Sequence, residues 1–410
     1  MKYLLVIGDG MADNPVPQLK KRTPLEVANI PTIDSLASRG VLGSVRTCPE
    51  GFPPGSDTAI MSIFGCAPAK YYSGRAPLEA ATVGLMLSSG DAAFRCNMVT
   101  VSEDTPYGER TILSHSAGSI EGEQSIALIN WLFAQPRFAE KAAEARVTVC
   151  PSPSFRHIAV RKRADLAGIV LPPPHDHLGE RVGDNLPHGC PDADLLRDLM
   201  ALSNELLDHC PINEQRRAEG KLPANTIWFW AEGTAAALPN FIQSYGHAGT
   251  VISAVPLCQG IARLVGLDTV TVEGANGEWD TNYEGKVRAA AAVLRRQDFV
   301  AVHLEGPDEA THNGQLREKI QAIEWLDSRM VSPLVAWLRD EGEDFRMLIL
   351  SDHKTLTTTR GHDGTPVPYI LYDSRQNTGA GLAYTEANGE KGPYLADGTD
   401  LMPLLFLKEK

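Results

Sequence analysis

The stretch Phe299-Val-Ala-Val-His-Leu-Glu-Gly-Pro-Asp308-Glu-Ala-Thr-His312 decides the fold class. It begins as a largely apolar strand and ends at residues of metal-ligand type. Asp308 and His312 are four residues apart, so on a helix their side chains share one face and could hold one metal ion. Taken alone, the spacing fits an ordinary helix start better than a metal site, because the helix dipole favours an aspartate there.

Two other apolar runs end in the same way. Tyr3-Leu-Leu-Val-Ile-Gly runs into Asp9, and Arg346-Met-Leu-Ile-Leu-Ser runs into Asp352 and His353, with His362 following in a glycine-rich loop. In open α/β sheets, ligands bind beyond the carboxyl ends of the strands. Each residue by itself could be a turn residue or a solvated loop residue. Their joint occurrence at strand ends predicts one shared metal site.

A fourth element is Gly51-Phe-Pro-Pro-Gly-Ser56-Asp57-Thr58, which leads into an apolar-periodic helix. A helix N-terminus offers free N–H groups that suit a phosphate. Serine is also a favoured helix cap, which is the simpler interpretation without the metal residues. With them, Ser56 is a candidate nucleophile, which a base or a metal must activate. A Gly-x-Ser-x-Gly turn is absent from this stretch, so a triad hydrolase is not supported.

The order of expected elements predicts an α/β fold, with a mostly parallel sheet sandwiched by helices. Residues 32–40 and 314–340 are expected to be helical, and residues 366–372 form a last strand that begins with proline, as an edge strand can. Between residues 90 and 247 the sequence differs in character, with a proline-rich stretch from Leu171 and a long helical stretch from Asp192 to His209. We therefore predict a discontinuous catalytic domain, 1–89 and 248–410, and an inserted second α/β domain, 90–247, that binds substrate as a lid.

Length and composition restrict the class of protein. The chain has 410 residues, enough for two domains, with 43% hydrophobic and 22% charged residues. No apolar run approaches the ~20 residues that span a bilayer. The start of the chain reads as a buried strand instead of a signal peptide. We therefore expect no membrane partner.

The cysteines and the net charge indicate the cellular compartment and the kind of partner. The seven cysteines are scattered without a Cys-x-x-Cys pair, which favours a reducing cytoplasm and argues against a thiolate zinc site. The net charge of −13 disfavours nucleic acid as a partner. A small anionic substrate remains compatible, because local arginines or metals can reverse the field in a pocket. The oligomeric state is left open.

Ligand type indicates which metals fit. Aspartate and histidine ligands without cysteine suit Mn²⁺, Zn²⁺ or iron, and Ca²⁺ less well. Two ions roughly 3.5–4 Å apart would clamp the attacking and leaving oxygens of a phosphoryl transfer.

In this order the motifs resemble the alkaline phosphatase superfamily, and within it the cofactor-independent phosphoglycerate mutases of the archaeal type. The resemblance covers nearly the whole chain and rests on segments 6–13, 53–59, 93–100, 281–286 and 303–327. It implies an alkaline-phosphatase-like core, a phosphoserine intermediate and a small phosphorylated substrate. It also implies a glycolytic isomerase that uses two divalent ions, Mn²⁺ first, with Zn²⁺, Mg²⁺ or Co²⁺ as alternatives.

The resemblance also implies roles for matching residues. One metal would be held by Asp9, Ser56, Asp352 and His353, and the other by Asp308, His312 and His362. Ser56 would accept the phosphoryl group, and Lys286 would act beside the phosphate. Substrate contacts are expected from Asp57, Arg95, Asn97, Arg156 and His157.

The chain departs from the family pattern in places. Thr311 replaces a glycine before the metal histidine, and Glu232 adds negative charge in a stretch that is richer in glycine elsewhere. The segment Thr281-Asn-Tyr-Glu-Gly-Lys286 resembles a bacterial branch proposed to phosphorylate homoserine. The alternatives to a mutase are therefore a homoserine-kinase-like phosphotransferase, a metal-dependent phosphatase or phosphodiesterase, and a non-catalytic metal-binding protein.

Overall fold

A computed structural model describes residues 1–103, 105–235 and 237–406. The chain divides into unit 1, Met1–Tyr72 with Ala237–Lys410, and unit 2, Ser73–Ala236. Both junctions lie earlier in the chain than the domain boundaries expected from sequence. At the first junction the reason is α5 (Arg75–Thr82), which packs on strands β3 and β7 of unit 2 and therefore belongs with them.

Unit 1 is built on an eight-stranded sheet with the order β15-β2-β14-β11-β1-β10-β8-β9. Strands β11, β1, β10, β8 and β9 are parallel to one another, whereas β14 is antiparallel to β11. Its strands are β1 (Lys2–Gly8), β2 (Val41–Val45), β8 (Gly249–Ile252), β9 (Asp268–Val270), β10 (Phe299–Leu304), β11 (Phe345–Leu350), β14 (Val367–Asp373) and β15 (Tyr394–Leu395). A separate two-stranded sheet joins β12 (Lys354–Leu356) to β13 (Gly361–Asp363).

The last long strand is not at an edge, so that expectation from sequence was wrong. Strand β14 lies antiparallel between β11 and β2, and the edges are β9 and β15. Pro366 lies outside the strand, while Pro368 lies inside it opposite Ser44. The Pro368 carbonyl accepts a hydrogen bond from the Tyr384 hydroxyl, so a side chain supplies a bond at this point of the sheet.

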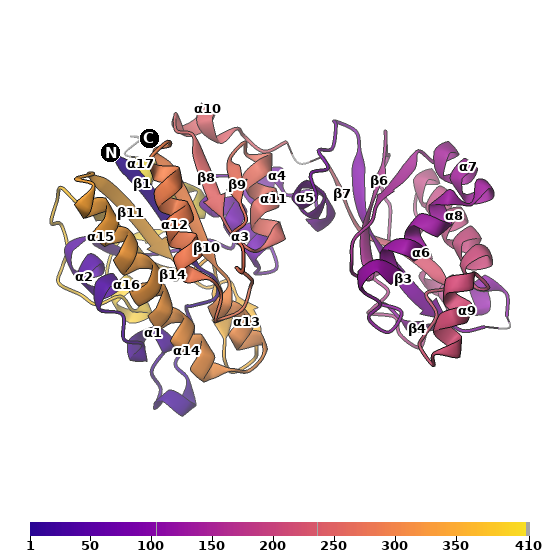
Figure 1. Ribbon diagram of the computed structural model, residues 1–410, viewed down its shortest axis with the longest axis horizontal. Coiled ribbons are helices and arrows are strands. Elements are labelled where there is room, and N and C mark those ends of the chain that lie inside the picture. The colour runs from indigo at the N-terminus through magenta and orange to yellow at the C-terminus, as the bar shows by residue number, and fades with distance from the viewer. Residues whose placement is uncertain (104, 236, 407–410) are drawn as a thin grey trace. The chain divides into compact units, whose positions relative to one another are not determined.

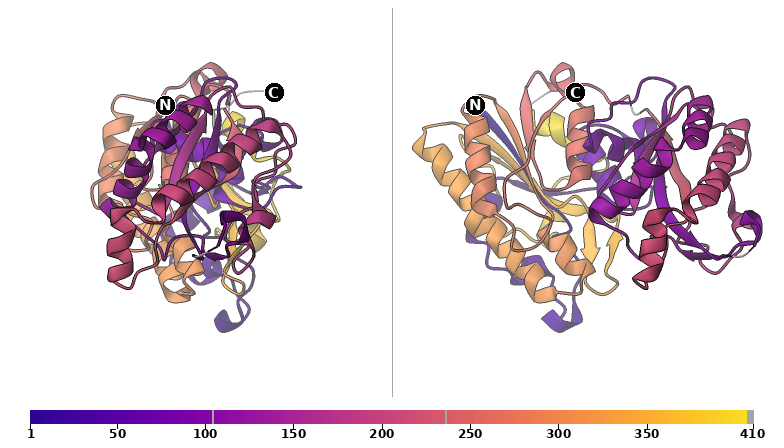
Figure 2. Two further views of the ribbon diagram at one scale, coloured as in Figure 1. Left: turned by 90° about the vertical axis from the view of Figure 1, so that its right-hand side faces the viewer. Right: turned by 45° about the vertical axis from the view of Figure 1, so that its right-hand side comes forward.

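Helices flank the large sheet (Figures 1 and 2). They are α1 (Pro24–Val27), α2 (Pro31–Arg39), α3 (Ser56–Ile63), α4 (Pro68–Tyr71), α10 (Phe241–Tyr245), α11 (Pro256–Leu264), α12 (Tyr283–Leu294), α13 (Gly306–His312), α14 (Leu316–Trp325), α15 (Ser332–Asp340), α16 (Glu386–Gly389) and α17 (Leu401–Phe406). The long helix expected over 314–340 is interrupted by a π-helical segment, Leu326–Val331. Pro333, the second residue of α15, lacks the N–H that a continuous α-helix needs, which explains the break.

The strand register brings the predicted site residues to one edge of the sheet. Ile7 of β1 pairs with His303 of β10 on one side and with Leu350 of β11 on the other. All three strands are parallel, so the residues that follow them meet at their common carboxyl edge. Sequence segments about 300 residues apart are thereby placed side by side.

Unit 2 is an antiparallel sheet covered by helices. Its strands are β3 (Ala92–Val101), β4 (Ile112–Ser114), β5 (Val147–Cys150), β6 (Arg156–Arg161) and β7 (Thr226–Thr234). Strand β3 pairs with β4, β6 and β7, and β6 pairs with β5. The other helices are α6 (Gly122–Ala134), α7 (Pro136–Glu144), α8 (Pro191–Leu207) and α9 (Pro211–Ala218).

Alternation along β3 decides what each face of this sheet buries. Phe94, Cys96 and Met98 belong to the main core, which includes residues of α6, α7 and α8. Ala93 packs instead in a small cluster with Ala76 of α5. The second face is therefore covered only in part by apolar contacts, and β3 also carries Arg95 and Asn97 there, since side chains alternate between faces.

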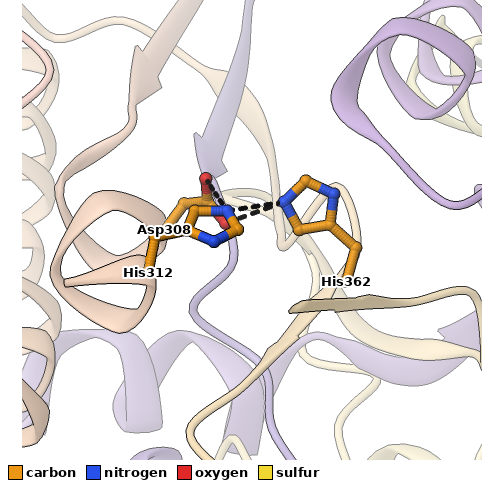
Figure 3. A group of neighbouring side chains, drawn as sticks. All are labelled: Asp308, His312 and His362. Atoms are coloured by element: carbon orange, nitrogen blue, oxygen red, sulfur yellow. Dashed lines mark hydrogen bonds and ion pairs between the residues drawn. The ribbon is translucent and has the colours of Figure 1, made fainter. Parts of the chain in front are cut away.

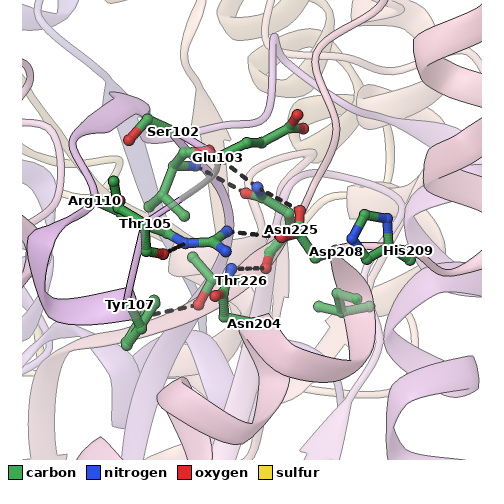
Figure 4. A network of polar contacts seen from close by, with 12 residues as sticks. Ser102, Glu103, Thr105, Tyr107, Arg110, Asn204, Asp208, His209, Asn225 and Thr226 are labelled. Carbon is green, nitrogen blue, oxygen red and sulfur yellow. Dashed lines mark hydrogen bonds and ion pairs between the residues drawn. The ribbon is translucent and has the colours of Figure 1, made fainter.

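A buried polar network ties the end of α8 to β3 and β7 (Figure 4). The Asp208 carboxylate accepts hydrogen bonds from Arg110 at 2.8 Å and from the Asn225 amide at 3.2 Å. The side-chain oxygen Oδ1 of Asn225 accepts a hydrogen bond from the backbone N–H of Val101 at 2.8 Å. These bonds satisfy groups that would destabilise the fold if they were buried without partners.

Two other features complete the description. Every cysteine in the chain is a free thiol. Among the described residues, none of the helices combines the length and the apolar character that crossing a bilayer requires.

Helix α8 offers a matched test of buried and exposed ion pairs. Asp192 binds Arg161 through both carboxylate oxygens at 2.6 Å, and both side chains are almost inaccessible. Asp192→Ala leaves a buried guanidinium uncompensated and should lower the free energy of unfolding by about 3 kcal/mol, measured by urea denaturation.

Glu205→Ala is the control, because Glu205 also lies in α8 but forms an exposed ion pair, with Arg137 of α7. The urea midpoint of that variant should match the wild type. Equal midpoints for the two variants would contradict the stabilising role of the buried pair.

Candidate active site

Two groups of side chains with metal-ligand chemistry lie at the carboxyl edge of β1, β10 and β11. One contains Asp9, Asp352 and His353, which we name ligand set A. The other contains Asp308, His312 and His362, which we name ligand set B. Within each set the ligand atoms lie within 4.8 Å of one another. Set A contains three of the four residues, and set B all three residues, that the family resemblance assigned to one metal each.

Ligand set A is fully buried. Asp9 follows β1, and Asp352 and His353 follow β11. The Nε2 atom of His353 lies 3.3 Å from Asp352 Oδ2 and 3.6 Å from Asp9 Oδ1. The Ser56 hydroxyl, at the first residue of α3, lies 3.1 Å from the same Nε2, to which it can donate, and 3.4 Å from Asp9 Oδ2. The predicted nucleophile and set A are thus in contact.

Set A has the properties of a cation site. Asp9 Oδ1 and Asp352 Oδ2 are buried and have no hydrogen-bond partner. Burial, followed by the charges of Asp352, Asp308 and Glu305, holds the pKa of Asp9 well above its usual range. Buried carboxylates of this kind require a counter-charge. A divalent ion bound by these oxygens would supply it, so the donor set fits a metal.

Ligand set B is more open and already contains a strong internal contact (Figure 3). Asp308 and His312 lie one turn apart on α13, and His362 comes from β13. The Nε2 atoms of His312 and His362 lie 3.2 Å and 3.4 Å from the two Asp308 oxygens, and 2.9 Å from each other. Three donors therefore point at one position that a cation could occupy.

The pKa of His312 indicates that a metal binding at set B must displace a proton. The hydrogen bond with Asp308 raises the pKa of His312 to about 9, although partial burial opposes this. His312 Nδ1 lies 2.8 Å from the carbonyl oxygen of Arg360, to which it donates. Deprotonation therefore frees Nε2, the atom that faces the set.

Two residues next to the ligands were missed from sequence. Fully buried His303 places Nε2 at 3.1 Å from Asp9 Oδ2 and Nδ1 at 3.1 Å from the Ser253 hydroxyl. Thr355 lies between Asp308 and His353, with contacts of 2.5 Å and 3.2 Å. His303 could have been noticed as a histidine inside an apolar strand. Thr355 had no such signal.

Lys286 and Asp57 lie in unit 1 with defined partners. Lys286 is 1% exposed and donates from Nζ to the carbonyl oxygen of His303 at 2.8 Å. Burial lowers its pKa to about 8. Asp57 accepts the backbone N–H of Thr58 and the hydroxyl of Tyr72, each at 2.9 Å. A contact between either side chain and a substrate stays a prediction.

Arg95 and Arg156 of unit 2 both lie against the ring of Trp230. Their guanidinium carbons are 4.7 Å and 5.6 Å from the ring centroid, and Arg156 also covers Phe155 at 5.3 Å. Arg95 binds both carboxylate oxygens of Glu79 and is thereby neutralised. The buried Nε of Arg156 has no hydrogen-bond partner.

Asn97 and His157 are used inside unit 2. Asn97 donates to the carbonyl of His115 and accepts from Trp230 Nε1, both at 2.9 Å. His157 accepts the backbone N–H of Ser152 at 2.9 Å and lies 3.3 Å from the Ser125 hydroxyl. Burial lowers its pKa to about 4. These bonds give both side chains a structural role, and their substrate role stays a prediction.

The two departures from the family pattern are also placed. Thr311 is buried in α13, where its hydroxyl donates to the carbonyl of Pro307 at 2.6 Å. Glu232 lies in β7 of unit 2, and burial raises its pKa.

Comparison with known proteins gives one consistent family. The family "2,3-bisphosphoglycerate-independent phosphoglycerate mutase" matches residues 37–213. A protein of that name from Methanosarcina acetivorans is 43% identical over 409 residues, with 99% of each chain covered. One from Ignicoccus hospitalis is 32% identical over 419 residues, covering 99% of this chain and 97% of that protein.

Solved structures agree with this result over the full length. A protein from Pyrococcus horikoshii has a TM-score of 0.81 at 30% identity, covering 100% of this chain and 99% of that one. A cofactor-independent phosphoglycerate mutase from Thermoplasma acidophilum has a TM-score of 0.70 at 25% identity, with 99% of each chain covered. The α/β fold expected from sequence, a mostly parallel sheet flanked by helices, is confirmed.

The raised pKa of His312 predicts that metal binding releases protons. Near pH 7, below its pKa of about 9, His312 is protonated, and a metal at Nε2 must displace that proton. Titration of metal-free protein with Mn²⁺ in buffers of different ionisation enthalpy should report at least about one proton released for the ion at set B. The apparent affinity should rise about tenfold per pH unit until His312 is neutral.

The control is His312→Asn, in which this proton release should be lost. An Mn²⁺ affinity that is independent of pH between 6 and 9 would contradict the assignment of His312.

Proposed function

The chain belongs to the family of 2,3-bisphosphoglycerate-independent phosphoglycerate mutases, and we propose that it interconverts 3- and 2-phosphoglycerate through a phosphoserine formed on Ser56. The observation that carries the proposal is the position of the Ser56 hydroxyl, 3.1 Å from His353 Nε2 and 3.4 Å from Asp9 Oδ2. A serine without a base or a metal beside it is a poor nucleophile. Here it lies against two ligands of set A.

Two divalent ions belong to the proposal. Set A with Ser56 would hold one, and set B would hold the other. When bound, such ions lower the pKa of an attacking hydroxyl and neutralise charge on the phosphoryl oxygens. Carboxylate and imidazole donors without thiolate suit Mn²⁺, which we propose first, with Zn²⁺, Mg²⁺ or Co²⁺ as alternatives.

The reaction is two matched transfers. The Ser56 oxygen forms a bond to phosphorus as the bond from phosphorus to one glycerate oxygen breaks, and the proton of Ser56 is passed to the departing oxygen. The other hydroxyl of the same glycerate then attacks the phosphoserine: its oxygen bonds to phosphorus, the bond from phosphorus to the Ser56 oxygen breaks, and its proton returns to Ser56. Water is neither used nor formed, so a mutase must exclude it from the phosphoserine.

The start of α3 and Lys286 can support both transfers. Ser56 begins α3, whose free N–H groups and dipole favour a phosphoryl group. Lys286 retains most of its charge near pH 7, because its pKa is about 8. We propose that it contributes positive charge beside the phosphate.

Unit 2, corresponding to the inserted domain expected from sequence, is proposed to supply substrate contacts and to close as a lid. Arg156 is the cation that supports this, since its Nε is unpartnered while Arg95 is neutralised by Glu79. A guanidinium suits the carboxylate of glycerate. The seven free thiols agree with a cytoplasmic enzyme, which we include in the proposal.

Ser56→Ala tests the nucleophile. In Mn²⁺-loaded protein, its mutase rate with 3-phosphoglycerate, coupled through enolase, should fall by at least about 10³-fold, because the group that accepts phosphorus is gone. Ser62→Ala is the control, since Ser62 is a buried serine of the same helix whose hydroxyl donates to the Thr58 carbonyl at 3.0 Å. It should retain the wild-type rate.

The products separate the alternatives. Free phosphate as the main wild-type product would establish a phosphatase and contradict the mutase. Absence of turnover in metal-loaded wild type, with phosphorylation of homoserine by a phosphate donor, would replace glycerate by homoserine as acceptor.

Arg156→Met tests the substrate contact. Loss of a charged hydrogen bond to the carboxylate should raise KM for 3-phosphoglycerate about 10–100-fold. Arg163→Met, a change at an exposed arginine of the same unit, should leave KM unchanged. An unchanged KM in Arg156→Met would remove Arg156 from the substrate site.

A further inference from the structure

The hydroxyl of Thr355 lies between the two ligand sets. The residue lies in β12, and its side chain is fully buried. Its Oγ1 donates to Asp308 Oδ1 of set B at 2.5 Å and lies 3.2 Å from His353 Nδ1 of set A. A single side chain therefore touches one ligand from each set.

The number of available protons fixes the direction of these bonds. The hydroxyl has one hydrogen, which the short contact assigns to Asp308. The contact with His353 is then a bond from Nδ1–H to the Thr355 oxygen. His353 carries its proton on Nδ1, so Nε2 presents a lone pair toward Asp9 Oδ1 and Asp352 Oδ2, at 3.6 Å and 3.3 Å.

The main chain of Thr355 is held on both sides. Its N–H donates to the carbonyl of Ala12 at 3.1 Å. Its carbonyl accepts from Lys319 Nζ at 2.7 Å, and Lys319 also binds Asp13 Oδ2 at 2.9 Å. Lys319 and Asp13 are both buried. The ion pair between Lys319 of α14 and Asp13, which follows β1, thereby holds the strand that carries Thr355 in place. The proposed chemistry does not use this ion pair.

Gly10 leaves the space that the Thr355 hydroxyl occupies. A Cβ at Gly10 would lie 2.4 Å from Thr355 Oγ1 and 2.7 Å from Asp308 Oδ1. Gly10 also has a φ of +61°, a region that glycine adopts without strain. A side chain here would push Thr355 away from both ligands.

We propose that Thr355 is a positioning residue that couples the two ligand sets: its hydroxyl orients Asp308 and fixes the tautomer of His353 in which Nε2 faces the metal position of set A. The inference rests on the proposed two-metal function and extends it to a side chain that contacts no metal itself. Partners of this kind orient metal ligands, and their loss typically weakens metal affinity by about 10–100-fold.

Mn²⁺ titration without substrate tests the proposal, because it reads metal binding independently of turnover. Thr355→Val has nearly the same volume but cannot accept from His353 or donate to Asp308. Its affinity should fall at least about tenfold at both ions. Thr355→Ser retains the hydroxyl and should restore affinity.

Thr250→Val is the matched control. Thr250 is also a buried threonine of unit 1, and its hydroxyl donates to Gln297 Oε1 at 2.6 Å, within β8 and away from both sets. It loses a buried hydrogen bond as Thr355→Val does, so a general loss of stability would weaken both variants alike. Proton–nitrogen spectra of His353 should show Nδ1–H in wild type and Thr355→Ser, and a changed tautomer population in Thr355→Val.

The outcomes separate this inference from the proposed function. Wild-type affinity and an unchanged His353 tautomer in Thr355→Val would overturn the role of Thr355, even if Ser56→Ala abolishes turnover. Loss confined to one ion would overturn the coupling. A wild type that binds two ions but has no mutase activity would contradict the proposed substrate, while the comparison of Thr355 variants would still be decided by the binding data.

Discussion

The structure depends on the close approach of two buried carboxylates, Asp9 and Asp352, each with an oxygen that has no partner. In a low-dielectric interior this arrangement is unfavourable, and burial with neighbouring negative charge raises the pKa of Asp9. It persists because β1 lies between β10 and β11 in fixed register, so the following residues have no freedom to separate. A divalent cation bound by these oxygens would resolve the conflict.

The surrounding contacts explain how the ligands keep their orientation. His303 binds Asp9 Oδ2 and leaves Oδ1 unpaired, while Thr355 binds Asp308 and His353. Lys286 donates to the carbonyl of His303. The buried lysines Lys286, Lys319 and Lys354 are thus bound to main-chain carbonyls, to Asp13 or to Asn14, instead of neutralising set A. Their arrangement holds the ligands and leaves the cation position to a metal.

The two units divide the chemistry by type of charge. Unit 1 gathers buried carboxylates and imidazoles, which suit metal ions and phosphoryl transfer. Unit 2 offers guanidinium groups against the face of Trp230, which suit a carboxylate. Glu79 neutralises one of these cations and leaves Arg156.

The sequence by itself determined the local features: apolar runs that end at Asp9, Asp308 and Asp352, a serine at a helix start, and the α/β rhythm. These depend on neighbours in the chain, so a linear pattern records them. Tertiary structure alone decided that β14 is internal, that a π-helical segment interrupts residues 314–340, and that Thr355 joins two ligand sets. Those outcomes depend on hydrogen bonds and packing between segments far apart in the chain, and an ordinary threonine carries no local sign of them.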